Sequence, residues 1–235
     1  MSLPSELSYA SALKFSPRGN SQISKQSRAI RDAIKNDQNL RIRKGGELVE
    51  VRGIDLAVSL LPPEMSKFPF LVDYLGPNVA LVPIPRSAPL SQKGALWPTH
   101  RICEELVKVG LGAEIAPLLV RKTAVQKSST ADPGMRPGPE QHYDSTGIDN
   151  NVPMLVERPL TMVDDFTTRG SSFVGMFRRL HEAFPNRIIR CFALMATESE
   201  GEIDRLMAPM QGTIRRYPSG KLWRSAGTSQ QPSLF

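Results

Sequence analysis

Cysteine and histidine are scarce in this sequence. Its 235 residues include two cysteines and three histidines, and no spacing among them is typical of a zinc site. Cys103 and Cys191 lie far apart, in a predicted helix and a predicted strand, which indicates buried free thiols. The sequence therefore argues against a disulfide-stabilised domain and against a Cys/His metal centre.

Long apolar runs are also absent. No uninterrupted stretch approaches the roughly 20 residues that are needed to span a bilayer. The first residues lack the basic region, apolar stretch and cleavage site of a secretory signal. Hydrophobic residues make up 40% of the chain, which is ordinary for a soluble protein with one sizeable core. We therefore expect a cytoplasmic protein.

Acidic residues are few in two regions, and the net charge is +7. Residues 14–52 contain ten Lys or Arg against four acids, and residues 206–235 contain four Lys or Arg and no acid. Positive charge suits both polyphosphate ligands and nucleic acid. A solvated basic surface is the simpler interpretation, and nucleic-acid contact through these basic regions is the alternative.

The most informative segment of the sequence lies between residues 159 and 173. Leu160–Val163 is apolar and predicts a buried strand. Asp164 and Asp165 follow it, then a polar loop with Gly170, then an amphipathic helix that begins near Ser171. Four hydroxyl side chains occupy the loop and the first turn of the helix, at Thr167, Thr168, Ser171 and Ser172.

This order of residues predicts an anion site at a strand end. The free N–H groups and the dipole of a helix N-terminus favour negative charge, and Gly170 lets the backbone approach a ligand closely. Asp164 and Asp165 can accept hydrogen bonds from two neighbouring sugar hydroxyls or face a bound Mg²⁺. A turn followed by a helix cap is the alternative, but the full combination favours a binding site.

Three segments resemble a known family. Val163-Asp-Asp-Phe-Thr-Thr-Arg-Gly-Ser-Ser172 is similar to the phosphoribosyl-pyrophosphate (PRPP) loop of type I phosphoribosyltransferases, with Arg169 in place of the second threonine. Val79-Ala-Leu-Val-Pro-Ile-Pro-Arg-Ser-Ala-Pro89 resembles the Val-Pro-Val-Pro strand of the ComF-like subgroup. Ala12-Leu-Lys-Phe-Ser-Pro-Arg-Gly19 is similar to its Leu-Lys-Tyr-Arg-Gly segment. The subgroup's N-terminal four-cysteine zinc module has no counterpart here.

The resemblance, over roughly residues 10 to 197, implies a set of site residues. Asp164 and Asp165 would hold the ribose hydroxyls and, partly through PRPP, Mg²⁺. Arg86 would join them as a catalytic residue. The 5′-phosphate would lie against Thr167, Thr168, Arg169, Gly170, Ser171 and Ser172. A pyrophosphate loop would comprise Arg86, Ser87 and Lys93, and Lys122 is an alternative to Lys93 as an assisting cation.

Alternating strands and helices predict an α/β fold with a mostly parallel sheet flanked by helices, as in type I phosphoribosyltransferases. We expect the core at residues 61–200, a helix and β-hairpin accessory region at 1–60, a C-terminal hairpin at 201–224 and a disordered tail at 225–235. The predicted helices cover residues 21–36, 98–109 and 171–184. The predicted strands cover residues 40–43, 47–52, 79–85, 114–120 and 188–196.

Some stretches give weaker indications. Residues 1–20 show no clear pattern, and residues 54–77 are apolar with several prolines and resist assignment. Ligands bind beyond the carboxyl ends of parallel strands, so the loops after residues 85, 120 and 165 should converge. The connection over residues 121–150 is long enough for a functional lid that closes over pyrophosphate, or it is a mobile surface loop.

The last residues carry a different motif. Gln231-Pro-Ser-Leu-Phe235 resembles the peptide by which bacterial replication and repair proteins dock on the sliding clamp. Leu234 and Phe235 would fill an apolar pocket while Gln231 fixes the register, although five residues also match by chance. Upstream, Tyr217 and Trp223 could stack on bases among the basic residues Arg215, Arg216 and Arg224, or pack the hairpin on the core.

Two classes of function follow from these features. In the first, the protein is a transferase that moves phosphoribose from Mg²⁺-PRPP to a nitrogen base or amine and releases pyrophosphate. In the second, it is a non-catalytic PRPP or nucleotide sensor, or a DNA-uptake or DNA-repair accessory protein recruited to the sliding clamp. The fold class alone does not decide between them.

Overall fold

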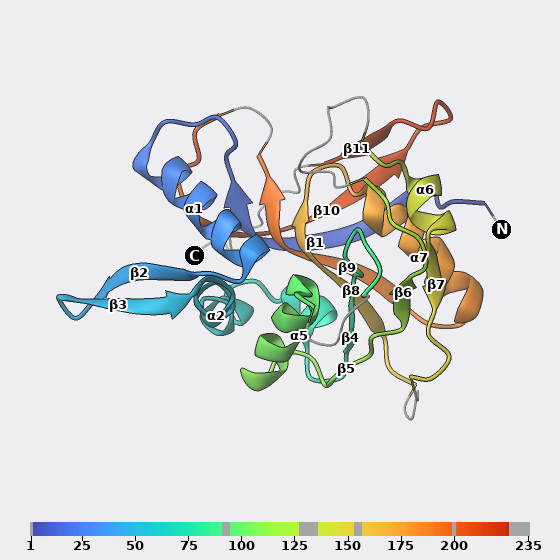
Figure 1. Cartoon of the computed structure of the whole chain (residues 1–235), viewed down its shortest axis with the longest axis horizontal. Coiled ribbons are helices and arrows are strands. Elements are labelled where there is room, and N and C mark those ends of the chain that lie inside the picture. The colour runs from blue at the N-terminus through green and yellow to red at the C-terminus, as the bar shows by residue number, and fades with distance from the viewer. Residues whose placement is uncertain (1, 91–94, 127–135, 153–156, 199–200, 226–235) are drawn as a thin grey trace, which may run out of the picture.

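The computed structural model describes residues 2–90, 95–126, 136–152, 157–198 and 201–225. A seven-stranded sheet of order β11-β10-β1-β9-β8-β4-β5 forms its centre (Figure 1). The neighbouring strands β1, β9, β8, β4 and β5 are parallel, whereas β10 runs antiparallel to both β1 and β11. The protein therefore has the expected α/β fold with a mostly parallel sheet. The strands of this sheet are β1 (Glu6–Phe15), β4 (Ala80–Pro83), β5 (Glu114–Ile115), β8 (Leu160–Thr167), β9 (Ile189–Thr197), β10 (Met207–Arg216) and β11 (Leu222–Arg224).

Helices pack on both faces of the sheet. In β9, Phe192 and Leu194 belong to one buried apolar cluster, and Cys191 and Ala193 belong to a second. The alternation follows from the pleat, which turns successive side chains to opposite faces. The first cluster contains residues of α1 (Gln22–Asn36), α2 (Gly53–Ser59), α4 (Leu71–Leu75) and α5 (Pro98–Lys108), and the second contains residues of α7 (Ser171–Ala183).

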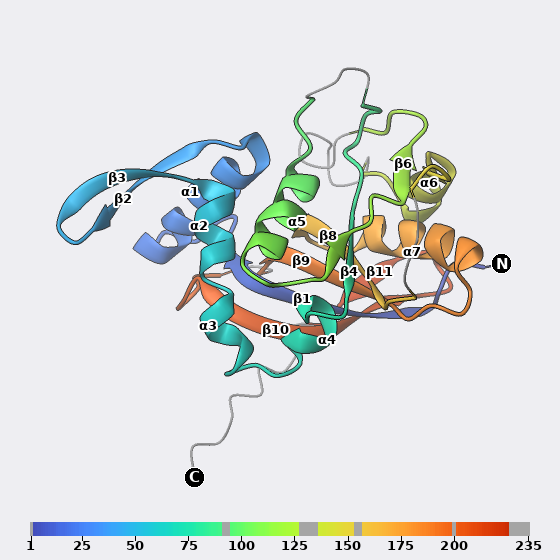
Figure 2. The ribbon, with the colours of Figure 1, turned by 90° about the horizontal axis from the view of Figure 1, so that it is seen from below.

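Several predicted elements are confirmed. Helices α1, α5 and α7 begin and end close to their expected bounds. The predicted hairpin comprises β2 (Asn39–Lys44) and β3 (Glu47–Arg52), which pair antiparallel around Gly45 and Gly46. Both glycines have positive φ, at 62° and 92°, as a tight two-residue hairpin turn requires. This hairpin projects away from the sheet in both views (Figures 1 and 2).

The N-terminal residues differ from expectation. Residues 1–20 show no clear pattern in the sequence, yet β1 lies inside the sheet between β10 and β9. Residues 6–15 therefore belong to the central sheet. Six consecutive residues of β1, from Tyr9 to Lys14, are buried or partly buried. The alternation that identifies a half-exposed strand is thus confined to Glu6–Tyr9, because both faces of the remaining residues are covered, and the strand was missed.

Other segments also differ. The single strand expected over residues 114–120 is instead β5 and, after Pro117, a separate β6 (Leu119–Arg121). Proline lacks the N–H that would continue the ladder. β6 pairs with β7 (Thr146–Ile148), and α6 (Pro139–Asp144) precedes β7, so the connection over residues 121–150 contains regular structure. The unassigned stretch 54–77 contains α2, α3 (Pro62–Met65) and α4.

Two further expectations concern cysteine and membranes. Cys103 and Cys191 are free and buried, as predicted, and burial raises the pKa of both thiols above the ordinary value. Across the described ranges, none of the helices combines the length and apolar character needed to cross a membrane.

Candidate functional site

A cavity of about 740 Å³ lies at the carboxyl ends of β4 and β8. The three loops that were expected to converge do so here, because residues 84–87, residues 164–172, and Arg121, Val125 and Gln126 all contribute to its lining. α1 contributes Lys35 and Asn36 from its last turn, and the segments around α5, α6 and β11 complete the wall. The cavity therefore brings together Asp164, Asp165, Arg86, Ser87 and the predicted phosphate-loop residues Thr167, Thr168, Arg169, Gly170, Ser171 and Ser172.

The two aspartates lie within the last residues of β8, which extends to Thr167 rather than ending at residue 163. Asp164 accepts hydrogen bonds on Oδ2 from Ser172 Oγ and on Oδ1 from the Asp165 N–H, each at 2.9 Å. Burial, and then the charge of Asp165, raise the pKa of Asp164 well above its ordinary range, while Ser172 and Lys35 act against this shift. Hydroxyl donors or a cation would stabilise this buried carboxylate in its charged form.

Gly170 joins the polar loop to α7. It has φ 84°, in the left-handed region, and a Cβ atom built on it would collide with the side chain of Ile214. Glycine is therefore required here both by conformation and by space. Gly170 is also the N-cap residue of α7, and no side chain of the described residues caps this helix. Its first turn carries no acid and lines the cavity through Ser171 and Ser172.

The predicted hydroxyls have different surroundings. Ser172 is bonded to Asp164, and Thr168 Oγ1 lies 3.0 Å from Thr197 Oγ1 at the end of β9. Thr167 Oγ1 is buried and has no hydrogen-bond partner within the described residues. Buried polar atoms normally have a partner. This one therefore has donor and acceptor capacity left over at the edge of the cavity.

Arg121 is a cavity residue that the sequence analysis did not identify. Its guanidinium is buried and donates from Nε to the Arg86 carbonyl at 2.9 Å and from Nη1 to the hydroxyls of Ser145 and Thr146 at 2.6 and 2.9 Å. No carboxylate forms an ion pair with it in the part of the chain that the structure describes. Burial lowers its pKa to about 10, and the charge of Asp164 opposes that shift. A buried cation without a paired carboxylate favours an anionic ligand.

His142 on α6 is a second residue that was overlooked. It lines the cavity and is only 7% exposed. Burial, and then the charge of Arg121, lower its pKa to about 4, so the imidazole is neutral at pH 7. Nδ1 has no hydrogen-bond partner among the described residues. The sequence signal was weak, because one histidine in a proline-rich connection has no partner at a recognisable spacing.

The remaining predicted residues are placed as follows. Arg86 Nη1 donates to the Leu96 carbonyl at 3.1 Å, and the Ser87 carbonyl accepts from Val125 at 2.8 Å. Lys122 is not a lining residue, and its side chain lies against Gly147. Four predicted residues, Lys93, Gln231, Leu234 and Phe235, fall outside the described residues.

The basic residues of the C-terminal hairpin have internal partners. Arg215 Nε lies 2.7 Å from Glu6 and Arg216 Nη2 lies 2.8 Å from Glu140, and Arg224 donates to backbone carbonyls. Tyr217 and Trp223 are about half exposed, at 47% and 48%. The aromatic rings are thus available for contact, while the neighbouring cations are already engaged.

The described residues contain no group of three or more His, Cys, Asp or Glu side chains arranged to hold a metal ion. Two adjacent aspartates suit Mg²⁺ only when other oxygen ligands complete its shell, and a phosphorylated ligand would supply these. Comparison with models of known protein families gives no match, and comparison with curated proteins gives none either.

Proposed function

We propose that the cavity binds Mg²⁺-PRPP and that the protein transfers its phosphoribosyl group to a nitrogen base or amine, with release of pyrophosphate. A type I phosphoribosyltransferase-like fold of the ComF-like kind is part of this proposal. The observation that carries it is the meeting, in one cavity, of the buried acid pair, the uncapped start of α7 and the buried Arg121. These three features suit a pentose, a monophosphate and a second anion respectively.

The 5′-phosphate would bind at residues 167–172. Backbone N–H groups at the start of α7, the helix dipole and nearby hydroxyls stabilise an anion there. Gly170 supplies the left-handed backbone turn that leads into α7, and Arg169 adds positive charge to the same wall. This arrangement binds phosphate mainly through the backbone, so it tolerates the replacement of a threonine by Arg169.

The ribose hydroxyls would donate to Asp164 and Asp165. Such hydrogen bonds favour the charged carboxylate and oppose the raised pKa of Asp164. Mg²⁺ would be held partly by these acids and partly by the ligand's own oxygens, where it would offset phosphate charge. The free acid pair is electrostatically unfavourable, and the bound ligand would relieve that cost.

The pyrophosphate would lie near Arg86, Ser87 and Arg121. During transfer the bond from the anomeric carbon to the pyrophosphate oxygen breaks, and a bond from that carbon to the acceptor nitrogen forms. The acceptor nitrogen then loses a proton, while negative charge accumulates on the leaving pyrophosphate. Cations that are already in position before the reaction stabilise this charge, and the protein does not have to rearrange around it. The cavity walls would hold the two reactants in position.

Calorimetry with Mg²⁺-PRPP tests the binding step, and a pyrophosphate-release assay across a panel of bases and amines tests transfer. We expect saturable binding of PRPP and of ribose 5-phosphate, and weaker binding of glucose 6-phosphate as a sugar-phosphate control. Release of pyrophosphate with one acceptor would support the transferase. Binding without release for every acceptor would favour the sensor, and absence of binding would contradict both.

A second proposal concerns the peptide Gln231-Pro-Ser-Leu-Phe235. Its apolar pair and leading glutamine support recruitment of the protein to a bacterial sliding clamp as a DNA-processing accessory. Capture of purified clamp by the full chain, compared with a variant that lacks residues 231–235, tests this directly. Equal capture by both proteins would exclude the peptide as the docking element.

A further inference from the structure

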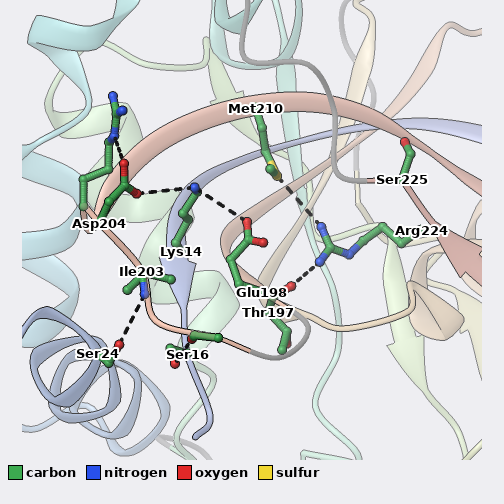
Figure 3. Close-up of polar contacts among 12 residues, drawn as sticks. Lys14, Ser16, Ser24, Thr197, Glu198, Ile203, Asp204, Met210, Arg224 and Ser225 are labelled. Atoms are coloured by element: carbon green, nitrogen blue, oxygen red, sulfur yellow. Dashed lines mark hydrogen bonds and ion pairs between the residues drawn. The ribbon is translucent and has the colours of Figure 1, made fainter. Parts of the chain in front are cut away.

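Arg224, at the end of β11, connects three segments that are far apart in the sequence. Its Nε donates to the Thr168 carbonyl at 2.9 Å, its Nη1 donates to the Tyr9 hydroxyl at 2.6 Å, and its Nη2 donates to the Thr197 carbonyl. Figure 3 shows the side chain extending to Thr197 at the end of β9, with Met210 of β10 on its other side. One guanidinium therefore joins the polar loop after β8 to β9 and β1.

The contact with Thr168 has a direct consequence for the loop. In a trans peptide the C=O and the following N–H point in opposite directions. Because Arg224 holds the Thr168 carbonyl, the N–H of Arg169 points away from Arg224. Thr168 and Arg169 line the cavity, whereas Arg224 does not. Arg224 thus lies behind the loop and fixes the orientation of a peptide unit whose other side borders the cavity.

The surroundings of Arg224 favour a fixed side chain. The guanidinium lies over the Tyr9 ring, 5.4 Å from its centroid. Tyr9 is buried, and its hydroxyl donates to the Ser225 carbonyl at 2.7 Å. Arginine is suited to this role because its planar group presents several donors in a rigid arrangement, which lysine cannot reproduce.

We propose that Arg224 is a positioning residue that holds the loop 167–170 in the conformation that binds the ligand's 5′-phosphate. This inference rests on the proposed function and extends it to a residue that touches no ligand. It predicts a selective effect, because pyrophosphate would bind near Arg86 and Arg121, which belong to other segments of the cavity lining. Loss of Arg224 should weaken ribose 5-phosphate binding and leave pyrophosphate binding nearly unchanged.

The test compares R224A and R224K with R215A, a control that removes an exposed arginine from the neighbouring strand. We expect R224A to raise the calorimetric Kd for ribose 5-phosphate by at least about tenfold, as for the loss of an interaction of ordinary strength. The Kd for pyrophosphate should stay within about twofold. R224K should resemble R224A, and millimolar free guanidinium should restore part of the affinity of R224A.

A second, milder variant keeps the test informative if R224A does not fold. Tyr9→Phe removes one partner of Arg224 while the ring remains, and we expect a smaller increase in the Kd for ribose 5-phosphate. The proposal is overturned if R224A binds ribose 5-phosphate like the unchanged protein, or if it loses both ligands equally. Equal effects of R224A and R215A would also overturn it.

Hydrogen exchange separates failure of this inference from failure of the proposed function. In the ligand-free protein, amides of residues 167–170 should exchange faster in R224A than in R215A. If the unchanged protein binds neither ligand, the proposed function fails and exchange alone decides the role of Arg224. Unaltered exchange in R224A would then reject the positioning role.

Discussion

Helices α1 and α7 both begin at the carboxyl edge of the sheet, and their N-termini have different surroundings. α1 follows a loop with Gly19 and several serines. Its N-cap residue Ser21 accepts from the Ser24 N–H at 3.1 Å, and Glu202 binds the residues around this cap. The Glu202 carboxylate accepts from the N–H groups of Asn20 and Ser21 at 2.5 and 2.8 Å and from Ser24 Oγ at 2.8 Å. α7 also follows a loop with glycine and hydroxyls, but no described side chain caps it and its first turn lines the cavity.

The acids near these two helices also differ in their pKa values. Hydrogen bonds from Ser21, and then from Asn20, lower the pKa of Glu202 to about 2, whereas burial and Asp165 raise that of Asp164. Glu202 is an internal anion with its hydrogen bonds satisfied. Asp164 is a carboxylate whose charge is opposed by its surroundings. Groups of the chain itself therefore occupy the start of α1, whereas none of the described side chains occupies the start of α7, where we propose that an external anion binds.

The largest effect is expected for Asp164→Asn, which removes the acid that distinguishes the α7 site. Losing two hydrogen bonds to a charged group should weaken binding of Mg²⁺-PRPP by about 100-fold or more. A raised folded-state pKa costs stability as pH rises above the unfolded-state value and through the folded-state value. The variant should therefore have a higher Tm than the unchanged protein at pH 8, and the gain should shrink toward pH 4.

Calorimetry and thermal melts at the two pH values measure these effects. Asp73→Asn, a substitution at an exposed aspartate outside the cavity, serves as the control and should alter neither quantity. A D164N protein that binds the ligand normally would contradict the assignment of the acid pair. A lower Tm at pH 8 would contradict the electrostatic account of Asp164.

A smaller effect is expected when α7 is given an internal anion, as α1 already has. Ser171→Asp places a carboxylate in the first turn, where it should stabilise the helix by about 0.3–1 kcal/mol. It should also compete with a bound phosphate and raise the Kd for ribose 5-phosphate by about tenfold or more. Ser171→Asn keeps the shape without the charge. Equal losses of affinity in the two variants would show that charge at this helix start is irrelevant.

The same comparison shows what the sequence could predict. The site beside α7 could be predicted because strand, acids, hydroxyls and glycine follow one another within residues 160–172, so local periodicity and turn chemistry identify them together. Helices α1, α5 and α7 and the β2–β3 hairpin were predictable for the same reason. Their side-chain patterns repeat over short distances.

The rest depends on contacts between distant segments. Glu202 accepts hydrogen bonds from the residues just before a helix that begins about 180 residues earlier, and Arg224 contacts Tyr9 across 215 positions. Arg121 gains its significance only from burial without a carboxylate partner. Beyond its first four residues, β1 lacks an alternating pattern because both of its faces are covered. No local rule reports such relations, since the tertiary fold creates them.

The smallest effect is expected for Glu202→Gln, which removes the carboxylate that binds the residues around the N-cap of α1. Ser21 still caps the helix, but weaker hydrogen bonds to Asn20, Ser21 and Ser24 should lower Tm by roughly 2–4 °C at pH 7, measured by thermal melting. Because the pKa of Glu202 is lowered in the folded state, its stabilisation is present above the ordinary value near 4.5 and is lost as pH falls through about 2. The difference in Tm between variant and unchanged protein should disappear over that range.

The E202Q variant also tests whether the start of α1 can bind an anion without any effect on the site at the start of α7. Ribose 5-phosphate affinity should stay within about twofold of the unchanged protein, because Glu202 does not line the cavity. Added inorganic phosphate should raise the Tm of E202Q more than that of the unchanged protein, since the Asn20 and Ser21 N–H groups would have lost their carboxylate partner and could bind an anion. If ligand affinity fell as far as it does in S171D, the two sites would not be independent, and the contrast between a closed and an open helix start would be wrong.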